Sequence, residues 1–318
     1  MENSFMPEGM RLNTDENKYY LSCFATLQKA YENRTVLEAV AVKCDNGMNL
    51  EFNLNGIRGI MPKCEVAYSV GGEEIKDIAV ITRVGKAVSF IIKEVKIEKN
   101  GALLVLSRRL AQKKCADYFI GDLIPGDIVR ARVTHLEHFG AFVDIGCGIV
   151  ALLPIDYISV SRISHPADRL CVGEYIYTVI KNIDYNNIRV YVSHKELLGS
   201  WEENANRFSV GQTVSGIVRS IESYGTFVEL APNLAGLAEN KSGLCIGDGV
   251  SVYIKSIIPD KMKIKLVIIE NFELCDSRTK LEYFADVDSQ KHIDVFRYSP
   301  DCCNRIIESV FGQTVNYE

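Results

Sequence analysis

Two pairs of aromatic residues with the same spacing stand out in the middle of the chain. A glycine and one further residue separate the rings of each pair, which are Phe139 with Phe142 and Tyr224 with Phe227. Glycine in a strand allows a bulge that reorients neighbouring side chains. Exposed rings on such a strand can stack on the bases of a single-stranded nucleic acid, at about 1–3 kcal/mol per base. The alternative is that one ring of each pair fills a core, although the hydroxyl group of Tyr224 favours a wet surface.

The two aromatic pairs belong to a longer internal repeat, and such a repeat indicates a chain built from several copies of one unit. Residues 138–145 (HFGAFVDI) and 223–230 (SYGTFVEL) are identical or similar at every position except the first. A weaker copy lies upstream, where residues 36–42 alternate in the same way as residues 129–135. Because the matching blocks recur in one order, the sequence predicts three copies of one domain.

Each copy is expected to be a small β-barrel. Its runs of Val, Ile and Tyr are short and bounded by Gly, Asn and Asp, which is typical of strands. Five short strands in about 60 to 75 residues indicate a closed oligonucleotide-binding barrel, the OB-fold. The expected fold class is mainly β, with three tandem five-stranded OB-fold barrels, linking helices and an α-containing C-terminal segment. The expected divisions are residues 1–33 (helical lead-in), 34–110, 124–198 and 208–270 (barrels) and 271–318 (C-terminal segment).

Helices are expected outside the barrels, where apolar residues recur at spacings of three and four. These segments are residues 18–33, 106–119 and 193–208. In the tail, one helical face is expected to carry Ile306, Ile307, Val310 and Phe311.

The repeated blocks resemble the S-one RNA-binding domain, which is named after the largest ribosomal protein of the bacterial small subunit. The resemblance rests on GDIV at residues 126–129, FGAFVDIG at 139–146, GEYI at 173–176 and RVYVS at 189–193. It covers residues 34–268 and is strongest in the second copy. A chain made almost wholly of such repeats resembles a short form of that ribosomal protein.

The resemblance implies a site for single-stranded RNA, formed by two aromatic residues, a histidine, an aspartate and an arginine on one barrel face. In the second copy these positions are Phe139, Phe142, Asp184 and Arg189, with Pro154 in place of the histidine. In the third copy they are Tyr224, Phe227 and Lys263, and the site is only partial. In the first copy Asn46 and Asn49 stand at the aromatic positions, so no stacking site is expected there.

Other basic or titratable side chains are further candidates for RNA contact. His138 directly precedes the first aromatic pair. Lys181 and Lys255 recur at one strand position of the second and third copies, and Lys93 takes this position in the first. Because the lysine persists where the aromatic site is lost, its recurrence favours a role in barrel geometry at least as much as RNA contact.

The charge balance limits how such an interface can bind. The chain has 36 Lys and Arg against 41 Asp and Glu, which gives a net charge of −5 and a pI of about 5.7. Residues 124–198 have net charge −1 and residues 208–270 net 0, whereas residues 271–318 have net −4. This distribution argues against a polycation that neutralises many phosphates. It is compatible with binding through stacking and a few local cations, with a shallow salt dependence.

Other function classes find little support in the sequence. Walker, nucleophile-elbow, HExxH and dinucleotide motifs are absent, so no catalytic residue, metal or cofactor is expected. No apolar run is long enough to span a membrane, and the N-terminus lacks the features of a signal peptide. The ten cysteines show no C-x-x-C spacing and are expected to be thiols in a reducing cytoplasm.

The expected function is sequence-tolerant binding of single-stranded RNA in the cytoplasm, led by the second barrel and assisted by the third. By resemblance, the RNA is mRNA and the context is translation at the small ribosomal subunit, on which the first barrel docks. Two alternatives stay open. One is a protein-interaction adaptor, and the other is a regulatory RNA-binding protein that is not resident on ribosomes.

Overall fold

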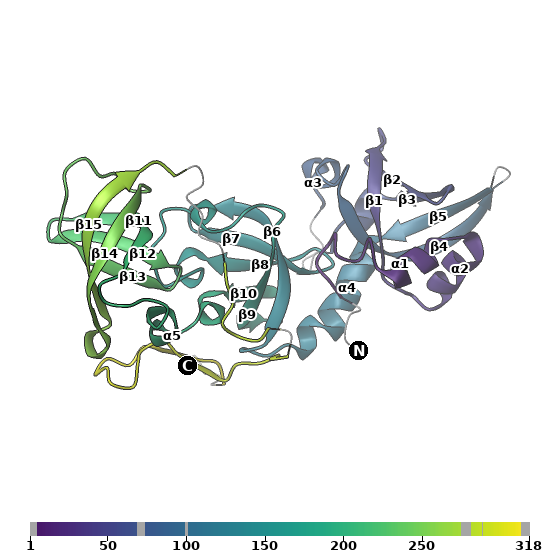
Figure 1. Ribbon diagram of the computed structural model, residues 1–318. Helices are drawn as coiled ribbons and strands as arrows, with labels where there is room; N and C mark the ends of the chain where they lie inside the picture. Colours follow the sequence, from purple (N-terminus) through teal and green to yellow (C-terminus); the bar gives the residue numbers. More distant parts are fainter. Residues whose placement is uncertain (1–4, 69–73, 99–100, 275–280, 288, 313–318) are drawn as a thin grey trace.

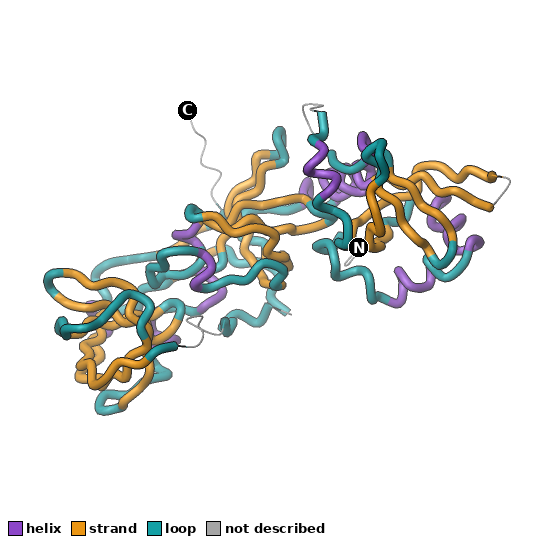
Figure 2. Tube along the Cα trace, turned by 90° about the horizontal axis from the view of Figure 1, so that it is seen from above, coloured by secondary structure: helices purple, strands orange, loops and turns teal. Residues whose placement is uncertain are grey.

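Three closed five-stranded barrels form the molecule, which confirms the mainly β fold expected from the repeats. In the computed structural model they follow one another along the long axis of the molecule (Figures 1 and 2). The second and third barrels lie close together, whereas the first is set apart beyond helix α4 (Figure 1). The structure describes residues 5–68, 74–98, 101–274, 281–287 and 289–312.

All three barrels share one strand connectivity. The first consists of β1 (Leu37–Cys44), β2 (Leu50–Leu54), β3 (Ile57–Met61), β4 (Ala87–Glu98) and β5 (Gly101–Ser107). The second consists of β6 (Ile128–Glu137), β7 (Gly140–Gly146), β8 (Ile149–Pro154), β9 (Tyr175–Asp184) and β10 (Arg189–Ser193). The third consists of β11 (Thr213–Glu222), β12 (Gly225–Ala231), β13 (Leu234–Ala238), β14 (Gly249–Ile258) and β15 (Lys263–Phe272). In each barrel the third and fifth strands pair in parallel, and this pairing closes the barrel.

Glycine at the start of the second strand allows that strand to lie against the third. A Cβ atom at Gly140 would lie 2.4 Å from the carbonyl oxygen of Leu153, and one at Gly225 would lie 2.7 Å from that of Ala238. Real Cβ atoms do not approach a carbonyl oxygen so closely, so both positions require glycine. The same requirement in two barrels explains why the glycine between the aromatic residues is repeated.

Helices connect and flank the barrels. They are α1 (Asp15–Tyr20), α2 (Phe24–Glu32), α3 (Asp77–Ile81), α4 (Arg108–Tyr118) and α5 (Trp201–Ala205). The short 3-10 helices are η1 (Lys63–Glu65), η2 (Ile120–Asp122), η3 (Ile155–Tyr157), η4 (Pro166–Asp168), η5 (Lys195–Leu198) and η6 (Pro259–Lys261). None of the described helices is long and apolar enough to cross a membrane.

The expected helices are present in part. The segment 106–119 contains α4, whose first turn is capped by the side chain of Ser107. The segment 18–33 is divided between α1 and α2. The segment 193–208 contains only η5 and α5, because Gly199 between them has a φ of +83°. This left-handed backbone conformation interrupts a helix that the apolar spacing alone had predicted.

The C-terminal segment is extended, so the expectation of a helix there is wrong for the residues that the structure describes. β16 (Val295–Arg297) and β17 (Glu308–Val310) form a two-stranded antiparallel sheet. Phe311 is buried, but Ile306 is exposed, so the residues assigned to one helical face do not share an environment. The tail obtains backbone hydrogen bonds from this small sheet and from the barrels instead of from a helix; the N–H of Ile293, for example, donates to the carbonyl oxygen of Gly126 at 2.9 Å.

The tail binds along both the second and the third barrel (Figure 1, yellow). On the second barrel, the N–H of Ile128 donates to the carbonyl oxygen of Lys291 at 2.8 Å. On the third barrel side, the N–H of Trp201 donates to the carbonyl oxygen of Tyr298 at 2.9 Å. The hydroxyl group of Tyr298 donates in turn to the carbonyl oxygen of Asn233 at 2.7 Å. The tail therefore acts as a strap that ties the two barrels together.

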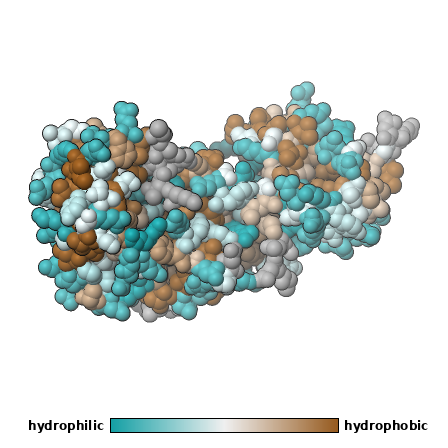
Figure 3. All heavy atoms as spheres, viewed as in Figure 1, coloured by the Kyte–Doolittle hydropathy of each residue, from teal (hydrophilic) through white to brown (hydrophobic). Residues whose placement is uncertain are grey.

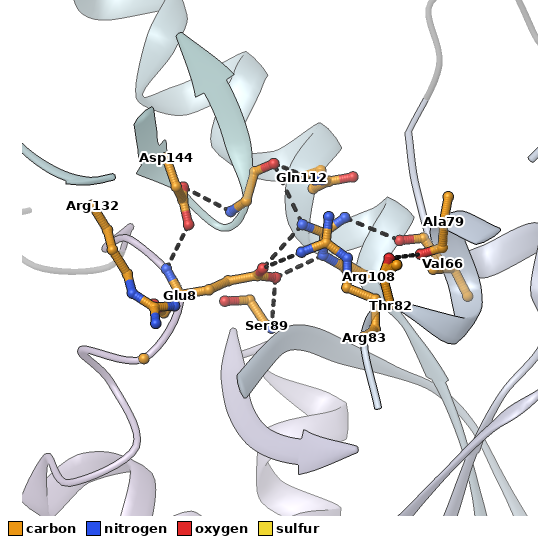
Figure 4. A network of polar contacts seen from close by, with 12 residues as sticks. Glu8, Val66, Ala79, Thr82, Arg83, Ser89, Arg108, Gln112, Arg132 and Asp144 are labelled. Atoms are coloured by element: carbon orange, nitrogen blue, oxygen red, sulfur yellow. Dashed lines mark hydrogen bonds and ion pairs between the residues drawn. The ribbon is translucent and has the colours of Figure 1, made fainter. Parts of the chain in front are cut away.

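The N-terminal segment fills the joint between the first and second barrels (Figure 4). The carboxylate of Glu8 accepts hydrogen bonds from Nε of Arg108 at 2.6 Å and from the N–H of Ser89 at 3.1 Å. The N–H of Glu8 donates to the carboxylate of Asp144 at 2.7 Å. Although burial opposes it, the Arg108 guanidinium holds the pKa of Glu8 below its usual range. Burial, with the neighbouring Glu8 charge, raises the pKa of Asp144 to about 7.

At the joint between the second and third barrels, a carboxylate forms the buried ion pairs, and its strand position is equivalent to that of Asp144. Glu229 in β12 corresponds in the repeat to Asp144 in β7. It accepts both arms of the Arg169 guanidinium, at 2.7 and 2.8 Å, and Nε of Arg219 at 2.8 Å. All three side chains are buried. In the second and the third barrel, an acidic residue of the second strand thus links the barrel to the part of the chain that precedes it.

Candidate nucleic-acid interface

The first aromatic pair lies on the outside of the second barrel. Phe139 precedes β7 and its side chain is 43 % exposed, while Phe142 is half-buried on the outer face of that strand. The inward positions of β7 are taken by Ala141 and Val143, which are fully buried. The two ring centroids lie 5.9 Å apart with an interplanar angle of 87°. Both rings therefore present surface to solvent at the turn between β6 and β7.

The second aromatic pair repeats this geometry on the third barrel. The rings of Tyr224 and Phe227 lie 6.1 Å apart, again with an interplanar angle of 87°. Tyr224 is 68 % exposed, and Phe227 is half-buried on the outer face of β12. The fold thus positions two similar aromatic platforms, one on each of the paired barrels.

Strand register extends the second-barrel platform into a row across four strands. Phe142 pairs in register with His135 of β6 on one side and with Leu152 of β8 on the other. Leu152 pairs with Tyr191 of β10. The rings of His135 and Phe142 are nearly parallel, with centroids 6.5 Å apart. His135, Leu152 and Tyr191 were missed by the sequence analysis, because their alignment with Phe142 depends on the pairing of strands far apart in the chain.

The corresponding row of the third barrel is more polar. Phe227 pairs with Ser220 of β11 and with Leu237 of β13, and Leu237 pairs with Lys265 of β15. An exposed lysine, Lys265, therefore takes the place that Tyr191 has in the second barrel. Lys265 is not among the residues predicted from the sequence either, although it lies only two residues beyond the candidate Lys263.

The β9–β10 hairpin of the second barrel carries Asp184 and Arg189 as register partners. The Asp184 carboxylate accepts hydrogen bonds from the N–H groups of Asn186 and Asn187, at 3.1 and 3.2 Å, and from the Asn187 amide side chain at 2.8 Å. These bonds, led by the one from the Asn187 side chain, lower the pKa of Asp184. Asp184 thus caps its own turn. Arg189 is exposed and lies two residues before Tyr191, on the same outer face of β10.

The equivalent hairpin of the third barrel is basic. Lys263 pairs in register with Ile258 at the end of β14, and its side chain is exposed. Lys261 precedes it in η6 and Lys265 follows it on the same face of β15, both also exposed. Lys255 of β14 is exposed as well. The third barrel therefore offers more cations around a smaller aromatic surface than the second barrel does.

The recurring lysine is a bulge residue in all three barrels. Lys93, Lys181 and Lys255 are each the extra residue at a register shift in the fourth strand of their barrel. A bulge leaves one residue unpaired and turns its side chain away from the regular alternation. The ammonium group of Lys181 lies 3.3 Å from the ring centroid of Tyr157, at the end of η3. The shared backbone role explains why the lysine persists in the first barrel, which lacks the aromatic pair of the other two.

His138 and His135 flank the turn that carries the aromatic pair. The ring of His138 meets that of Phe139 edge to face, with centroids 5.3 Å apart, and it is exposed. His135 Nε2 lies 2.7 Å from Oε1 of Glu137. Two imidazoles therefore border the two phenylalanine rings on the outer face of the second barrel.

The first barrel carries ion pairs where the second carries its aromatic row. Strand pairing places Lys43, Glu51 and Ile60 in one row, and Ile60 pairs with Val105. The position of Phe142 is thus taken by Glu51 and not by Asn49, because the turn between β1 and β2 differs in length from that between β6 and β7. Glu51 lies 3.2 Å from the ammonium group of Lys43 and 2.9 Å from the guanidinium of Arg58.

Comparison with known proteins agrees with the geometry of the second barrel. Residues 122–195 match the S1 RNA binding domain family, so the second barrel belongs to that family. The chain is 31% identical over 261 residues to small ribosomal subunit protein bS1 of Leuconostoc lactis, covering 75% of this chain and 58% of that protein. It is 31% identical over 218 residues to a bS1 homolog of Bacillus subtilis, covering 66% of this chain and 54% of that protein.

A third relative has a different name. The chain is 29% identical over 264 residues to a protein of Clostridium acetobutylicum named 4-hydroxy-3-methylbut-2-enyl diphosphate reductase. This match covers 78% of the present chain and 40% of that protein. The chain thus spans about half the length of the curated relatives that it matches.

Proposed function

Since the second barrel is an S1 RNA binding domain and the chain is similar to small-subunit ribosomal proteins, we propose that this chain binds single-stranded RNA without strong sequence preference. The second barrel provides the main contact surface and the third assists. The chain acts by binding and performs no chemical step, and its RNA is cytoplasmic mRNA in translation.

The observation that carries this proposal is the recurrence of one ring geometry on two adjacent barrels. Phe139 with Phe142 and Tyr224 with Phe227 have nearly the same centroid separation and the same interplanar angle. Rings exposed at strand ends are stacking platforms that accept any base, because every base has a π-face. Arg189 and Lys263 are exposed on the adjoining hairpins, which supports the proposal that they contact phosphate groups.

The first barrel is proposed to contact protein, as part of an association with the small ribosomal subunit. The charged side chains in the outer row of this barrel form an ion pair with each other, and the row has no aromatic residue. An apolar patch lies over α3 and β1 instead (Figure 3, upper right). The exposed apolar residues of this patch are Val40, Val42, Ile78, Ile81 and Val84. Exposed apolar clusters of this kind are typical of protein interaction sites.

Fluorescence anisotropy with a labelled, unstructured RNA tests the proposed function. The intact chain should bind, and Phe139→Ala/Phe142→Ala should weaken binding by at least about fivefold if at least one stacked base is lost, at about 1–3 kcal/mol per base. Tyr118→Ala is the matched control, because Tyr118 is an exposed ring on α4, away from both platforms. Affinity of the double variant within twofold of the unchanged chain would refute the stacking site.

The apolar patch of the first barrel favours a second candidate function, that of a protein-interaction adaptor. Co-sedimentation with small ribosomal subunits at moderate salt separates the possibilities. Association that is lost in Val42→Asp/Ile81→Asp but kept in Phe139→Ala/Phe142→Ala would support docking through the first barrel. Failure of the intact chain to co-sediment would contradict the ribosomal setting and leave a non-ribosomal RNA-binding protein.

A further inference from the structure

Two lysine side chains of the second barrel converge on one tyrosine ring. The ammonium groups of Lys181 and Lys195 lie 3.3 and 4.6 Å from the ring centroid of Tyr157. Each contact is a favourable cation–π interaction. Together, however, the two contacts bring two positive charges close to each other. Within the described residues, neither lysine forms an ion pair with a carboxylate. The nearby Glu196 is buried and bonded to the hydroxyl groups of Ser193 and Ser309.

In the first barrel, a carboxylate takes the position that the tyrosine ring has in the second barrel, and it balances the lysine charge. Glu65 is the last residue of η1, as Tyr157 is the last residue of η3, and a proline precedes both turns. The bulge lysine Lys93, equivalent to Lys181, lies 2.6 Å from the Glu65 carboxylate. The hydroxyl group of Ser107 also bonds to Glu65.

The second lysine of the pair also has a basic counterpart in the first barrel. Arg109 follows Ser107 by two residues, as Lys195 follows Ser193, and both serines end the fifth strand of their barrel. The charge of Arg109 acts on Glu65 and favours its ionised form. The first barrel thus arranges two cations around a carboxylate, whereas the second arranges two cations around a neutral ring. The difference lies in the ion pairing: Glu65 pairs with the bulge lysine Lys93 in the first barrel, whereas Glu196, the carboxylate beside Ser193, forms no ion pair with Lys181 or Lys195 among the described residues.

From this difference we infer that Lys181 and Lys195 bind an external anion beside Tyr157, and that the anion is a phosphodiester of the bound RNA. This inference rests on the proposed function and adds a phosphate subsite to it. The phosphate would stand where the first barrel has the Glu65 carboxylate. Lysine is well suited to this role, because its ammonium group is a mobile point charge with three donors.

The position of the subsite relative to the platform favours RNA over an acidic peptide. The N–H of Ile155, the first residue of η3, donates to the carbonyl oxygen of Phe139 at 2.9 Å. The turn that ends in Tyr157 therefore begins beside the backbone of Phe139, the residue that carries the exposed ring of the stacking platform. A strand whose base stacks on Phe139 can continue along η3, with the next phosphate between the two lysines.

Salt-dependent RNA binding tests the subsite. Lys181→Gln/Lys195→Gln should weaken binding of an unstructured RNA by about three- to tenfold at low salt. It should also lower the slope of log K against log [salt] by about 0.7, the value for one phosphate contact on a single strand. Tyr157→Glu installs the carboxylate of the first barrel and should have the same effect. Lys93→Gln/Arg109→Gln is the matched control in the first barrel and should leave both quantities unchanged.

The outcomes separate this inference from the proposed function. If both second-barrel variants keep the salt slope and affinity of the unchanged chain, while Phe139→Ala/Phe142→Ala weakens binding, the subsite is refuted and RNA stacking stands. If none of these variants changes RNA binding, the proposed function fails together with the subsite. Equal losses in the first-barrel control would also refute the inference, because the effect would then reflect total charge.

Discussion

Phe139 and Phe142 stand almost perpendicular to each other, with ring centroids 5.9 Å apart, and the fold reproduces this relationship 85 residues later at 6.1 Å. Two rings at right angles can contact one base by stacking and a second by its edge. Because Gly140 and Gly225 both lie against a carbonyl oxygen of the neighbouring strand, the ring geometry depends on backbone packing and not on the RNA.

The aromatic platform of the second barrel should contribute more to RNA affinity than the platform of the third barrel. Tyr224→Ala/Phe227→Ala should weaken binding by a smaller factor than Phe139→Ala/Phe142→Ala, because the third-barrel row has Lys265 where the second has Tyr191. Anisotropy titrations of both double variants at one salt concentration measure the difference. An equal or larger loss from the third-barrel change would show that the rows are not ranked by their aromatic surface.

The row position that is Tyr191 in the second barrel and Lys265 in the third should contact a different part of the RNA in each barrel. Tyr191→Ala should lower affinity without changing the salt slope, since stacking releases no counterion. Lys265→Ala should lower the salt slope by about 0.7 with a smaller loss of affinity at high salt. Titrations from low to moderate salt distinguish the two variants. Parallel salt dependences would contradict the assignment of Tyr191 to bases and Lys265 to phosphate.

The sequence predicted the barrels and the exposed rings because both follow from local patterns. Alternating Val and Ile residues define the strands, and the spacing of Phe139, Gly140 and Phe142 repeats in the third barrel. His135 and Tyr191 could not be found in this way. They join Phe142 only through the register of β6 and β10, and register between distant strands is not encoded in any one segment.

The errors of the sequence analysis also have physical causes. The sequence repeat predicts Asn49 at the position of Phe142, but the strand pairing places Glu51 there, since turn lengths differ between repeats. The tail residues Ile306, Ile307, Val310 and Phe311 have helical spacing, yet in a short segment such spacing does not exclude an extended chain. Phe311 is buried in a cluster with Val179 and Leu197 of the second barrel region. Tertiary contacts, absent from a local pattern, decide its conformation.

Acidification should loosen the strap on the second barrel through His194. This histidine is fully buried, its Nδ1 lies 3.1 Å from the carbonyl oxygen of Ile158, and its Nε2 lies 3.2 Å from the Tyr283 hydroxyl. Burial lowers the pKa of His194 to about 4, compared with about 6.5 in an unfolded chain. The unfolded chain therefore binds more protons between these values, so stability is lost as the pH falls from about 6.5 to about 4.

The loss from this one group should reach about 3 kcal/mol at the acidic end of that range. Urea unfolding, followed by the fluorescence of Trp201, the single tryptophan, measures it at several pH values. His194→Gln keeps a polar side chain that does not titrate, so its unfolding free energy should vary less with pH over this range. An unchanged pH dependence in that variant would show that other groups control the acid sensitivity.

The joint between the second and third barrels should depend on the charge of Glu229. Glu229→Gln leaves the buried guanidinium groups of Arg169 and Arg219 without their counter-ion, which should cost about 3–5 kcal/mol. Urea unfolding reports the loss. Glu282→Gln is the control, because Glu282 and Arg207 form a half-exposed ion pair at 2.7 Å, and its loss should cost less than about 1 kcal/mol. Similar losses for the two changes would contradict the role given to the buried joint.

Ultraviolet cross-linking of a bound, unstructured RNA, with the linked peptides identified by mass spectrometry, tests the central claim most directly. The account predicts nucleotide adducts on the peptides that contain Phe139 with Phe142 and Tyr224 with Phe227. It predicts none on residues 50–61 of the first barrel, where Glu51 stands in the equivalent row. Adducts concentrated on the first barrel, with the two aromatic platforms unmodified, would contradict binding of RNA by stacking on these rings.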